Sequence, residues 1–208
     1  MVDAWNVVHT ERQALIDDLG KLSSEQWNTP SLCDGWTVHD VLAHLVDDAK
    51  TTKPGFIRSL ILAGFNFDRL NQKGVDLERK SDPADTLESF RRVSDRTTSA
   101  PAPLASRLVE IIVHGEDIRR PLGIAHTYPI DAVVLALEYQ VATSGSMGGS
   151  KDRVADLHLV ATDTSWSHGT GAEVRGTVLD LLMAITGRPV PNDVLSGEGA
   201  AQVRDRQH

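Results

Sequence analysis

The strongest helical pattern in the sequence is LASRLVEIIVHGEDIRRPL, residues 104–122. Apolar side chains recur in it every three or four residues and would form one stripe, as expected for a helix that packs on a core. Pro103 precedes this stretch and Gly123 follows it, and these residue types are favoured where helices begin and end. We therefore expect one long amphipathic helix here.

Similar apolar spacing predicts helices along most of the chain before residue 144. Thr37 and Asp40 form a pair of capping-box type ahead of one such stretch. Asp82 followed by Pro83 is typical of another helix start. The expected helical ranges are 3–19, 38–50, 56–73, 83–98, 104–122 and 130–142. Residues 1–144 are therefore predicted to form a helical bundle.

The composition changes at residues 144–150, SGSMGGS, which are expected to form a flexible connector. Alternation of apolar and polar residues then replaces the helical spacing, as in a strand. The elements expected beyond the connector are a strand at 155–161, a second strand at 173–175, a helix at 176–185 and a frayed tail. The predicted fold class is mainly α, with the bundle followed by a small C-terminal α/β domain over residues 151–208.

Charge and composition exclude several classes of protein. The 21 Lys and Arg residues against 29 Asp and Glu residues give a net charge of −8, which argues against a nucleic-acid partner. No apolar run approaches the ~20 residues needed to span a bilayer, and the N-terminus lacks the pattern of a signal peptide. The single cysteine, Cys33, can form no internal disulfide and fits a reducing compartment, so we expect a cytoplasmic protein without a membrane partner.

Glu110 and His114 lie four residues apart in the strongest helix, so their side chains leave the same helix face. A carboxylate and an imidazole on one face are suitable ligands for Zn²⁺ or another divalent transition metal. Most Glu and His pairs at this spacing are ordinary solvated pairs, however, so the spacing alone favours that simpler interpretation.

His44 lies among apolar residues of the stretch 38–50, where a buried imidazole needs a polar partner. One interpretation is a hydrogen bond with a backbone carbonyl, Asp40 or Asp48. The other is that this helix packs beside residues 104–122 and that His44 supplies a third metal ligand, which would leave a fourth position open. Spacing alone favours the first interpretation.

Two motifs in this region resemble a known family. The stretches SLCDGWTVHDVLAHL (31–45) and LVEIIVHGEDIR (108–119) are similar to the mycothiol-dependent maleylpyruvate isomerase family of DinB-like four-helix bundles. The stretches LHLVATDTSW (157–166), GTVLDLL (176–182) and TGR (186–188) look like the small C-terminal domain that many members carry. The resemblance spans nearly the whole chain, and residues 51–100 are its least distinctive part.

The resemblance implies that His44, Glu110 and His114 bind a divalent metal, usually zinc and alternatively nickel. It also implies mycothiol as the thiol cosubstrate, a small electrophile as substrate, and an isomerase or S-transferase activity. Two imidazoles and one carboxylate leave a divalent ion with a net charge of about +1, which favours thiolate over thiol. Glu116 departs from the family pattern, where a bulky residue is common, and could alter the cavity beside the metal.

Other residues have weaker claims on function. Asp117 is a candidate to orient His114, although three-residue spacing is also common in solvated pairs. Arg119 could bind a carboxylate of the cofactor or substrate, or simply stabilise the end of its helix. Cys33 is expected to pack within its loop, and Trp36 to act as a hydrophobic staple. The histidines expected at the surface or in loops are His9, His39, His126, His158 and His168.

Two alternatives to the thiol-dependent enzyme remain. The apolar segment 56–67 is typical of an interface, which would suit a non-catalytic module that binds a metal, a small ligand or a partner. A metal-dependent hydrolase that activates bound water would use the same three ligands.

Overall fold

The computed structural model describes residues 2–206 and divides the chain into two compact units, with the boundary between Thr127 and Tyr128. The composition indicated a boundary at the connector 144–150, later in the chain. The helix α7 (Ile130–Ala142) accounts for the difference, because it packs against α8 (Val178–Ile185) within the C-terminal unit. A mainly α chain with a helical bundle followed by a small α/β unit is confirmed.

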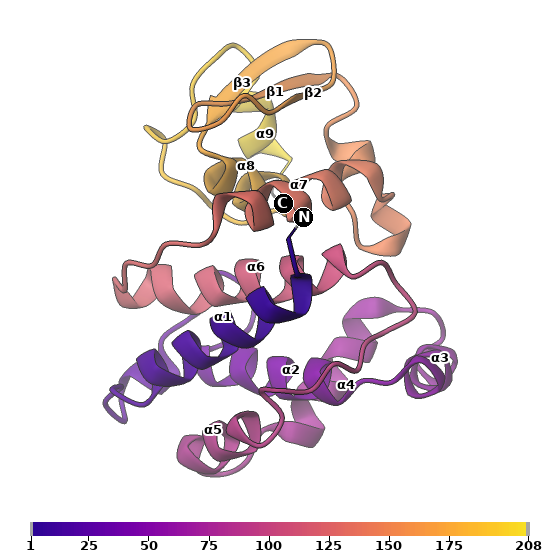
Figure 1. Ribbon diagram of the computed structural model, residues 1–208, viewed down its shortest axis with the longest axis vertical. Helices are drawn as coiled ribbons and strands as arrows, with labels where there is room; N and C mark the ends of the chain where they lie inside the picture. Colours follow the sequence, from indigo (N-terminus) through magenta and orange to yellow (C-terminus); the bar gives the residue numbers. More distant parts are fainter. Residues whose placement is uncertain (1, 207–208) are drawn as a thin grey trace. The chain divides into compact units, whose positions relative to one another are not determined.

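The N-terminal unit is built from helices around a shared apolar core. In chain order they are α1 (Ala4–Leu19), the short 3₁₀ helix η1 (Gln26–Asn28), α2 (Val38–Lys50), α3 (Lys53–Leu62), α4 (Phe67–Glu78), α5 (Pro83–Arg91) and α6 (Ala105–Leu122). The central helix is α2, which contacts α4, α5 and α6, while α1 lies beside α6 (Figure 1). Leu15, Leu42 and Leu108 are fully buried where these helices meet.

The helix starts follow the sequence signals. Thr37 accepts a hydrogen bond from the backbone of Asp40, and the Asp40 carboxylate accepts from the backbone of Thr37, so the capping box is confirmed. The Asp82 side chain caps α5, with Pro83 at its first position. The left-handed Gly123 (φ 68°) ends α6, where glycine adopts this conformation without strain.

One continuous helix was expected over residues 56–73, but the chain forms α3 and α4 there. They are separated by Gly64 and Phe65, whose φ angles are 67° and 59°, because a left-handed pair cannot continue a right-handed helix. Gly74 was expected to end this stretch and instead lies inside α4. A Cβ at Gly74 would lie 2.4 Å from the carboxylate of Asp47 on α2, so glycine permits the close approach of the two helices.

The C-terminal unit combines α7 and α8 with a small sheet. Its strands are β1 (Leu157–Ala161), β2 (Ser167–His168) and β3 (Ala172–Gly176), in the order β2-β1-β3. The pair β1 and β3 is parallel, with Leu159 opposite Val174, and β2 is antiparallel to β1. The strands expected at 155–161 and 173–175 are confirmed as β1 and β3. The strand β2 was not expected, because its two exposed residues are too few to form an alternating pattern.

The connector 144–150 and the tail are more ordered than expected. The connector contains the short 3₁₀ helix η2 (Gly145–Met147), and a second short 3₁₀ helix, η3 (Lys151–Arg153), follows it. The buried Ser150 hydroxyl forms hydrogen bonds with the Gln140 side chain and the carbonyl of Ile185. The tail forms α9 (Ala200–Asp205), which buries Val203 and packs on β3 and α8. Tertiary contacts therefore order segments whose composition indicated flexibility. Among residues 2–206, no helix is long and apolar enough to cross a membrane.

We predict that Gly74→Ala lowers the free energy of unfolding by about 1–2 kcal/mol, because the new methyl group overpacks the contact between α2 and α4. At an unconstrained helical position the same change would raise the free energy of unfolding, because alanine forms helices better than glycine. Urea unfolding would measure the change, and Asp47→Ala in the same chain should recover part of it. An additive double variant would contradict the proposed contact.

Candidate metal centre

Three side chains from two adjacent helices converge on one point. His44 lies in the middle of α2, and Glu110 and His114 lie one turn apart on α6. Each offers a ligand atom within 4.8 Å of the other two. The Nε2 atoms of both histidines lie 3.3 Å from the same carboxylate oxygen, Oε2 of Glu110. The packing of α2 on α6 therefore joins residues that are 66 positions apart in the sequence.

The cluster is largely buried but still accessible from outside. The exposed fractions of the His44, His114 and Glu110 side chains are 9%, 13% and 29%. Glu110 therefore retains the most contact with solvent. The two imidazoles are therefore mostly shielded from water.

The surroundings of His44 show which polar groups it contacts. Its Nδ1 atom is buried and has no hydrogen-bond partner among the described residues. The expected carboxylates bind elsewhere, since Asp40 pairs with Arg79 and Asp48 with Arg107. A buried imidazole with an unsatisfied nitrogen is costly, and the polar partner of His44 is Glu110, which lies 3.3 Å from its Nε2.

The donor set fits a divalent metal ion. Two imidazole nitrogens and one carboxylate oxygen are the three protein ligands of many catalytic zinc sites, in which a fourth position is open. His114 Nδ1 lies 2.8 Å from Oδ2 of Asp117. A hydrogen bond of this kind places the proton on Nδ1 and leaves Nε2 with a lone pair for a metal. His44, Glu110 and His114 could therefore hold the ion, with Asp117 orienting one ligand.

Electrostatics oppose the neutral forms of two of these groups in the metal-free protein. Burial disfavours charge on Glu110, but hydrogen bonds with His114 and His44 outweigh it and hold the Glu110 pKa well below its usual value. Burial also disfavours charge on His114, yet interactions with Cys33, Asp117 and Glu110 raise the His114 pKa well above its usual value. A metal ion would replace a proton between these groups.

A buried ionic chain supports the carboxylate ligand. Arg107 is 6% exposed, forms an ion pair with Asp48, and its Nη2 lies 3.9 Å from Oε1 of Glu110. Asp48 also lies 3.8 Å from Arg12 of α1. The two cations offset the cost of burying Asp48, and Arg107 attracts the Glu110 oxygen that does not face the histidines.

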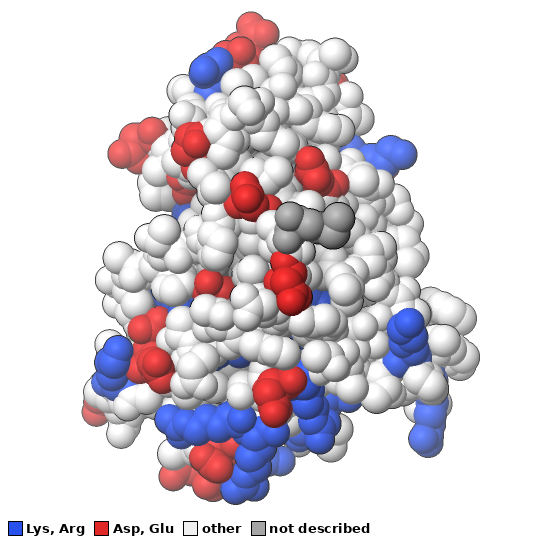
Figure 2. All heavy atoms as spheres, viewed as in Figure 1, with Lys and Arg blue, Asp and Glu red and all other residues white. Residues whose placement is uncertain are grey.

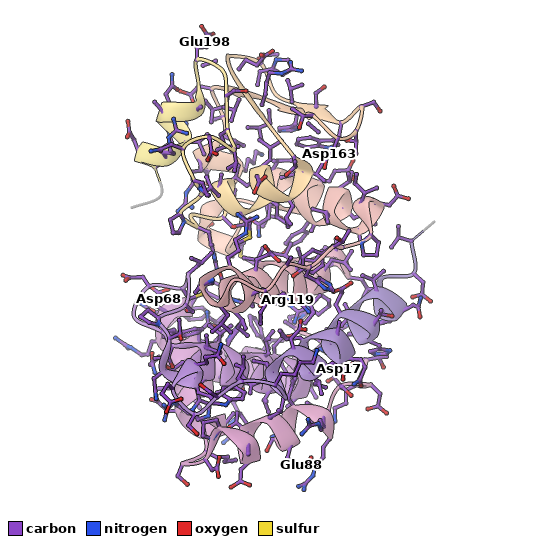
Figure 3. All side chains as sticks on the ribbon, turned by 90° about the vertical axis from the view of Figure 1, so that its left-hand side faces the viewer. Asp17, Asp68, Glu88, Arg119, Asp163 and Glu198 are labelled. Carbon is purple, nitrogen blue, oxygen red and sulfur yellow. The ribbon has the colours of Figure 1, made fainter. Side chains whose placement is uncertain are left out.

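The remaining candidates of α6 serve the interior of the unit. Arg119 is 1% exposed and donates to Asp18 of α1 at 2.9 Å, and Figure 3 shows it among the packed helices. Arg119 therefore ties α6 to α1 inside the unit. Glu116 is buried and accepts from Arg120 at 2.7 Å. Because it lies two residues from His114, it leaves a different helix face from the ligands.

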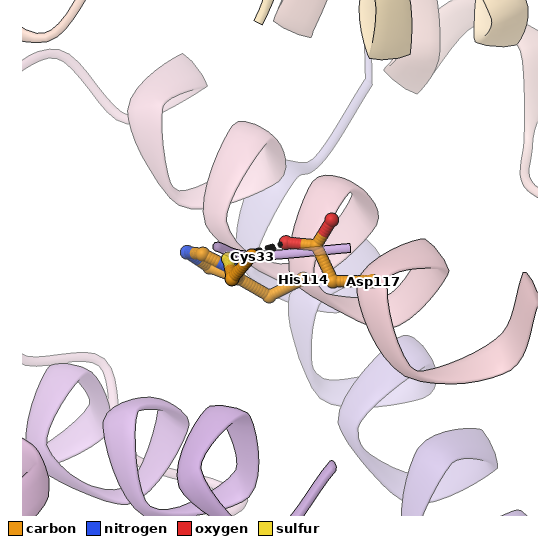
Figure 4. A group of neighbouring side chains, drawn as sticks. All are labelled: Cys33, His114 and Asp117. Atoms are coloured by element: carbon orange, nitrogen blue, oxygen red, sulfur yellow. Dashed lines mark hydrogen bonds and ion pairs between the residues drawn. The ribbon is translucent and has the colours of Figure 1, made fainter. Parts of the chain in front are cut away.

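Cys33 is the site residue that the sequence did not reveal. It was expected to pack within its loop, but its Sγ lies 3.0 Å from Oδ2 of Asp117 and 3.6 Å from Nδ1 of His114 (Figure 4). These residues are separated by 84 and 81 positions, and no spacing rule connects them. Cys33, His114 and Asp117 also form a second group of potential ligand atoms within 4.8 Å.

His39 differs from the expectation, and Trp36 has contacts beyond those that a staple predicts. His39 was expected at the surface and is 2% exposed, because it points from α2 toward α5 and bonds to the Thr86 hydroxyl at 2.8 Å. Trp36 was expected to act as a staple, and its ring lies 5.3 Å from the ring of His44 while its Nε1 donates to Gln72. Trp36 therefore borders the candidate site.

Two hollows among the described residues lie in the C-terminal unit, away from the three candidate ligands in the sequence. A shallow hollow of about 520 Å³ lies within the C-terminal unit, where Glu138, Trp166 and His168 line it. On the face shown in Figure 2, basic and acidic side chains are interspersed over the N-terminal unit.

The fold and the cluster together define a helical-bundle protein with a candidate His, Glu and His metal site. The family model for the mycothiol maleylpyruvate isomerase N-terminal domain matches residues 8–119, and the chain belongs to this family. The matched range includes all three candidate ligands.

Solved structures agree on the fold. A crystal structure of the mycothiol-dependent maleylpyruvate isomerase, and one of a histidine-to-alanine mutant of it, each match with a TM-score of 0.60. Each match covers 95% of this chain and 92% of the other, at 14% sequence identity. No curated protein matches the chain.

We predict that His114 makes the metal-free protein more stable at low pH. Its pKa in the folded protein is raised, so its contribution is complete below the unfolded value of about 6.5 and is lost as the pH rises through the folded value. Urea unfolding in the presence of a chelator would compare the parent with His114→Gln. The stability difference should be larger near pH 6 than near pH 9.

His39 provides a control of opposite sign. Burial and nearby Arg79 lower its pKa, so the stability of the parent relative to His39→Gln should fall as the pH drops below about 6.5. A difference for His114→Gln that stays constant with pH would contradict the assigned electrostatics.

Proposed function

We propose that this protein binds a divalent metal ion, zinc first and nickel as the alternative, through His44, Glu110 and His114. The observation that carries the proposal is the convergence of two Nε2 atoms on one carboxylate oxygen, at 3.3 Å each. The hydrogen bond between His114 Nδ1 and Asp117 supports it. Family membership supports the same three positions.

The proposed reaction is a mycothiol-dependent isomerisation or S-transfer. A bound divalent ion would supply positive charge that favours the thiolate form of mycothiol. The thiolate adds to the activated double bond of a small electrophile and forms a carbon–sulfur bond. The electron pair of the double bond moves to the activating group. Rotation about the resulting single bond, return of the electron pair and loss of the same thiolate give an isomer. If the carbon instead takes up the proton that the thiol released, the carbon–sulfur bond persists and the product is a thioether.

The chain's own residues position and shield this chemistry. Asp117 holds His114 with Nε2 facing Glu110. Hydrogen bonds with His114 and His44, with a smaller contribution from Arg107, keep Glu110 charged despite its burial, and Arg107 attracts its second oxygen. The ring of Trp36 lies against that of His44 and excludes water from that side, which strengthens the electrostatic interactions inside the site. We also propose a reducing, cytoplasmic compartment, because a single cysteine can form no internal disulfide.

The second candidate function is a binding module that keeps the fold without catalysis. The observation that favours it is a group of exposed apolar side chains on and beside α3. Its members are Ile57, Ile61, Leu62 and Phe65, all more than half exposed. A hydrolase that activates water at the same ligands is the third candidate. A requirement for mycothiol in turnover separates the first candidate from both others.

We predict that the purified parent contains close to one equivalent of zinc or nickel, and that His44→Ala and His114→Ala lose it, because each removes one of three ligands. Elemental analysis would measure the metal, and circular dichroism would show that the variants remain helical. His39→Gln is the matched control, since it changes another buried histidine of α2. A metal-free parent that stays so after incubation with Zn²⁺ would contradict the site.

Turnover is predicted to require both mycothiol and Glu110. Maleylpyruvate, the substrate in the relatives' names, is the first electrophile to assay. Glu110→Gln should lower kcat/KM at least about 100-fold. Loss of a residue that only supports a ligand costs about 10- to 100-fold, and loss of a ligand itself should cost at least as much. Gln72→Ala, which removes a contact of Trp36 and no ligand, is the control for folding. Equal rates with and without mycothiol would exclude the thiol mechanism and favour the hydrolase.

A further inference from the structure

Two donors meet on one buried oxygen behind the proposed metal site. The Asp117 side chain is fully buried, and its Oδ2 lies 2.8 Å from His114 Nδ1 and 3.0 Å from Cys33 Sγ (Figure 4). The Cys33 thiol donates to this carboxylate. Cys33 thus lies on the Nδ1 edge of the His114 ring, whereas Glu110 lies at Nε2.

We infer that Cys33 is a positioning residue for the metal site: its thiol holds the Asp117 carboxylate in the orientation that aligns His114. The inference rests on the proposed function, because the alignment matters only if His114 binds a metal. Partners of metal-bound histidines commonly tune affinity, and Cys33 would act one step further out, through Asp117.

Packing of the loop does not require the thiol. The backbone N–H of Leu32 donates to the carbonyl of Asp117 at 3.2 Å and ties the loop to α6. The Ser31 hydroxyl donates to the Trp36 carbonyl and accepts from the Cys33 N–H, at 2.8 and 3.1 Å. These backbone and Ser31 bonds fix the loop without the thiol. The Sγ hydrogen bond can therefore serve to orient the Asp117 carboxylate, which is buried and needs hydrogen-bond donors.

The first measurement is the Zn²⁺ dissociation constant of the metal-free parent, Cys33→Ala and Cys33→Ser, by competition with a chromophoric chelator. Cys33→Ala removes the donor and should weaken binding about fivefold, which corresponds to ~1 kcal/mol at 1.4 kcal/mol per tenfold change. Cys33→Ser keeps a donor and should bind within about twofold of the parent. Equal affinity for all three proteins would overturn the inference.

A double-variant cycle tests whether Cys33 acts through Asp117. In the Asp117→Ala background, Cys33→Ala should cause no further loss of affinity. Ser31→Ala is the matched loop control, since it removes loop hydrogen bonds and leaves the thiol and Asp117 unchanged; it should lower Tm and retain affinity. If Cys33→Ala weakens binding equally in both backgrounds, or if Ser31→Ala mimics it, the role is structural and the inference is wrong.

Co²⁺ substitution distinguishes positioning from ligation. The expected spectrum of the Co²⁺-loaded parent lacks the near-ultraviolet charge-transfer band of a coordinated thiolate. Such a band, lost in Cys33→Ser, would make Cys33 a ligand and overturn the inference. If the parent binds no metal, the metal site itself is wrong. If the parent binds Zn²⁺ and the Cys33 variants bind it with the same affinity, only the role of Cys33 is wrong.

Discussion

The packing of α2 against α6 is the constraint on which the site depends. Each helix alone carries an incomplete set of candidate ligands: α2 contributes His44, and α6 contributes Glu110 and His114. Burial of apolar side chains such as Leu42 and Leu108 holds the two helices together. Hydrophobic packing is non-directional and does not by itself align polar groups. The polar cluster therefore depends on the register and angle at which the two helices pack. The contact places both imidazoles against one carboxylate.

Around this contact, α6 carries an unusual number of buried charges, and each has a defined partner. Arg119 bonds to Asp18, Arg107 to Asp48, and Asp117 to His114. A buried charge without a partner would be strongly destabilising, so these pairs restrict how α6 can sit against α1 and α2. The same bonds hold Glu110 and His114 in place, and such preorganisation is what the proposed metal site would need.

Local signals predicted the helices well and failed where a distant residue decided the outcome. The Thr37 box and the Asp82–Pro83 start are local, and both were confirmed. Gly74 was expected to end a helix, but its position is explained by Asp47 on another helix. His39 was expected at the surface, but the face of α2 that it occupies is covered by α5. Periodicity identifies a buried face only when apolar residues mark it, and His39 does not.

By itself, the sequence determined where most helices lie, that Glu110 and His114 share a helix face, and which motifs relate the chain to its family. The tertiary structure decided that His44 joins them, that Arg119 is internal, and that the Cys33 thiol reaches Asp117. The physical reason is the range of the interactions. Helix spacing and caps act over about four residues, whereas the site joins positions 33, 44 and 110–117, which only the packing of the core brings together.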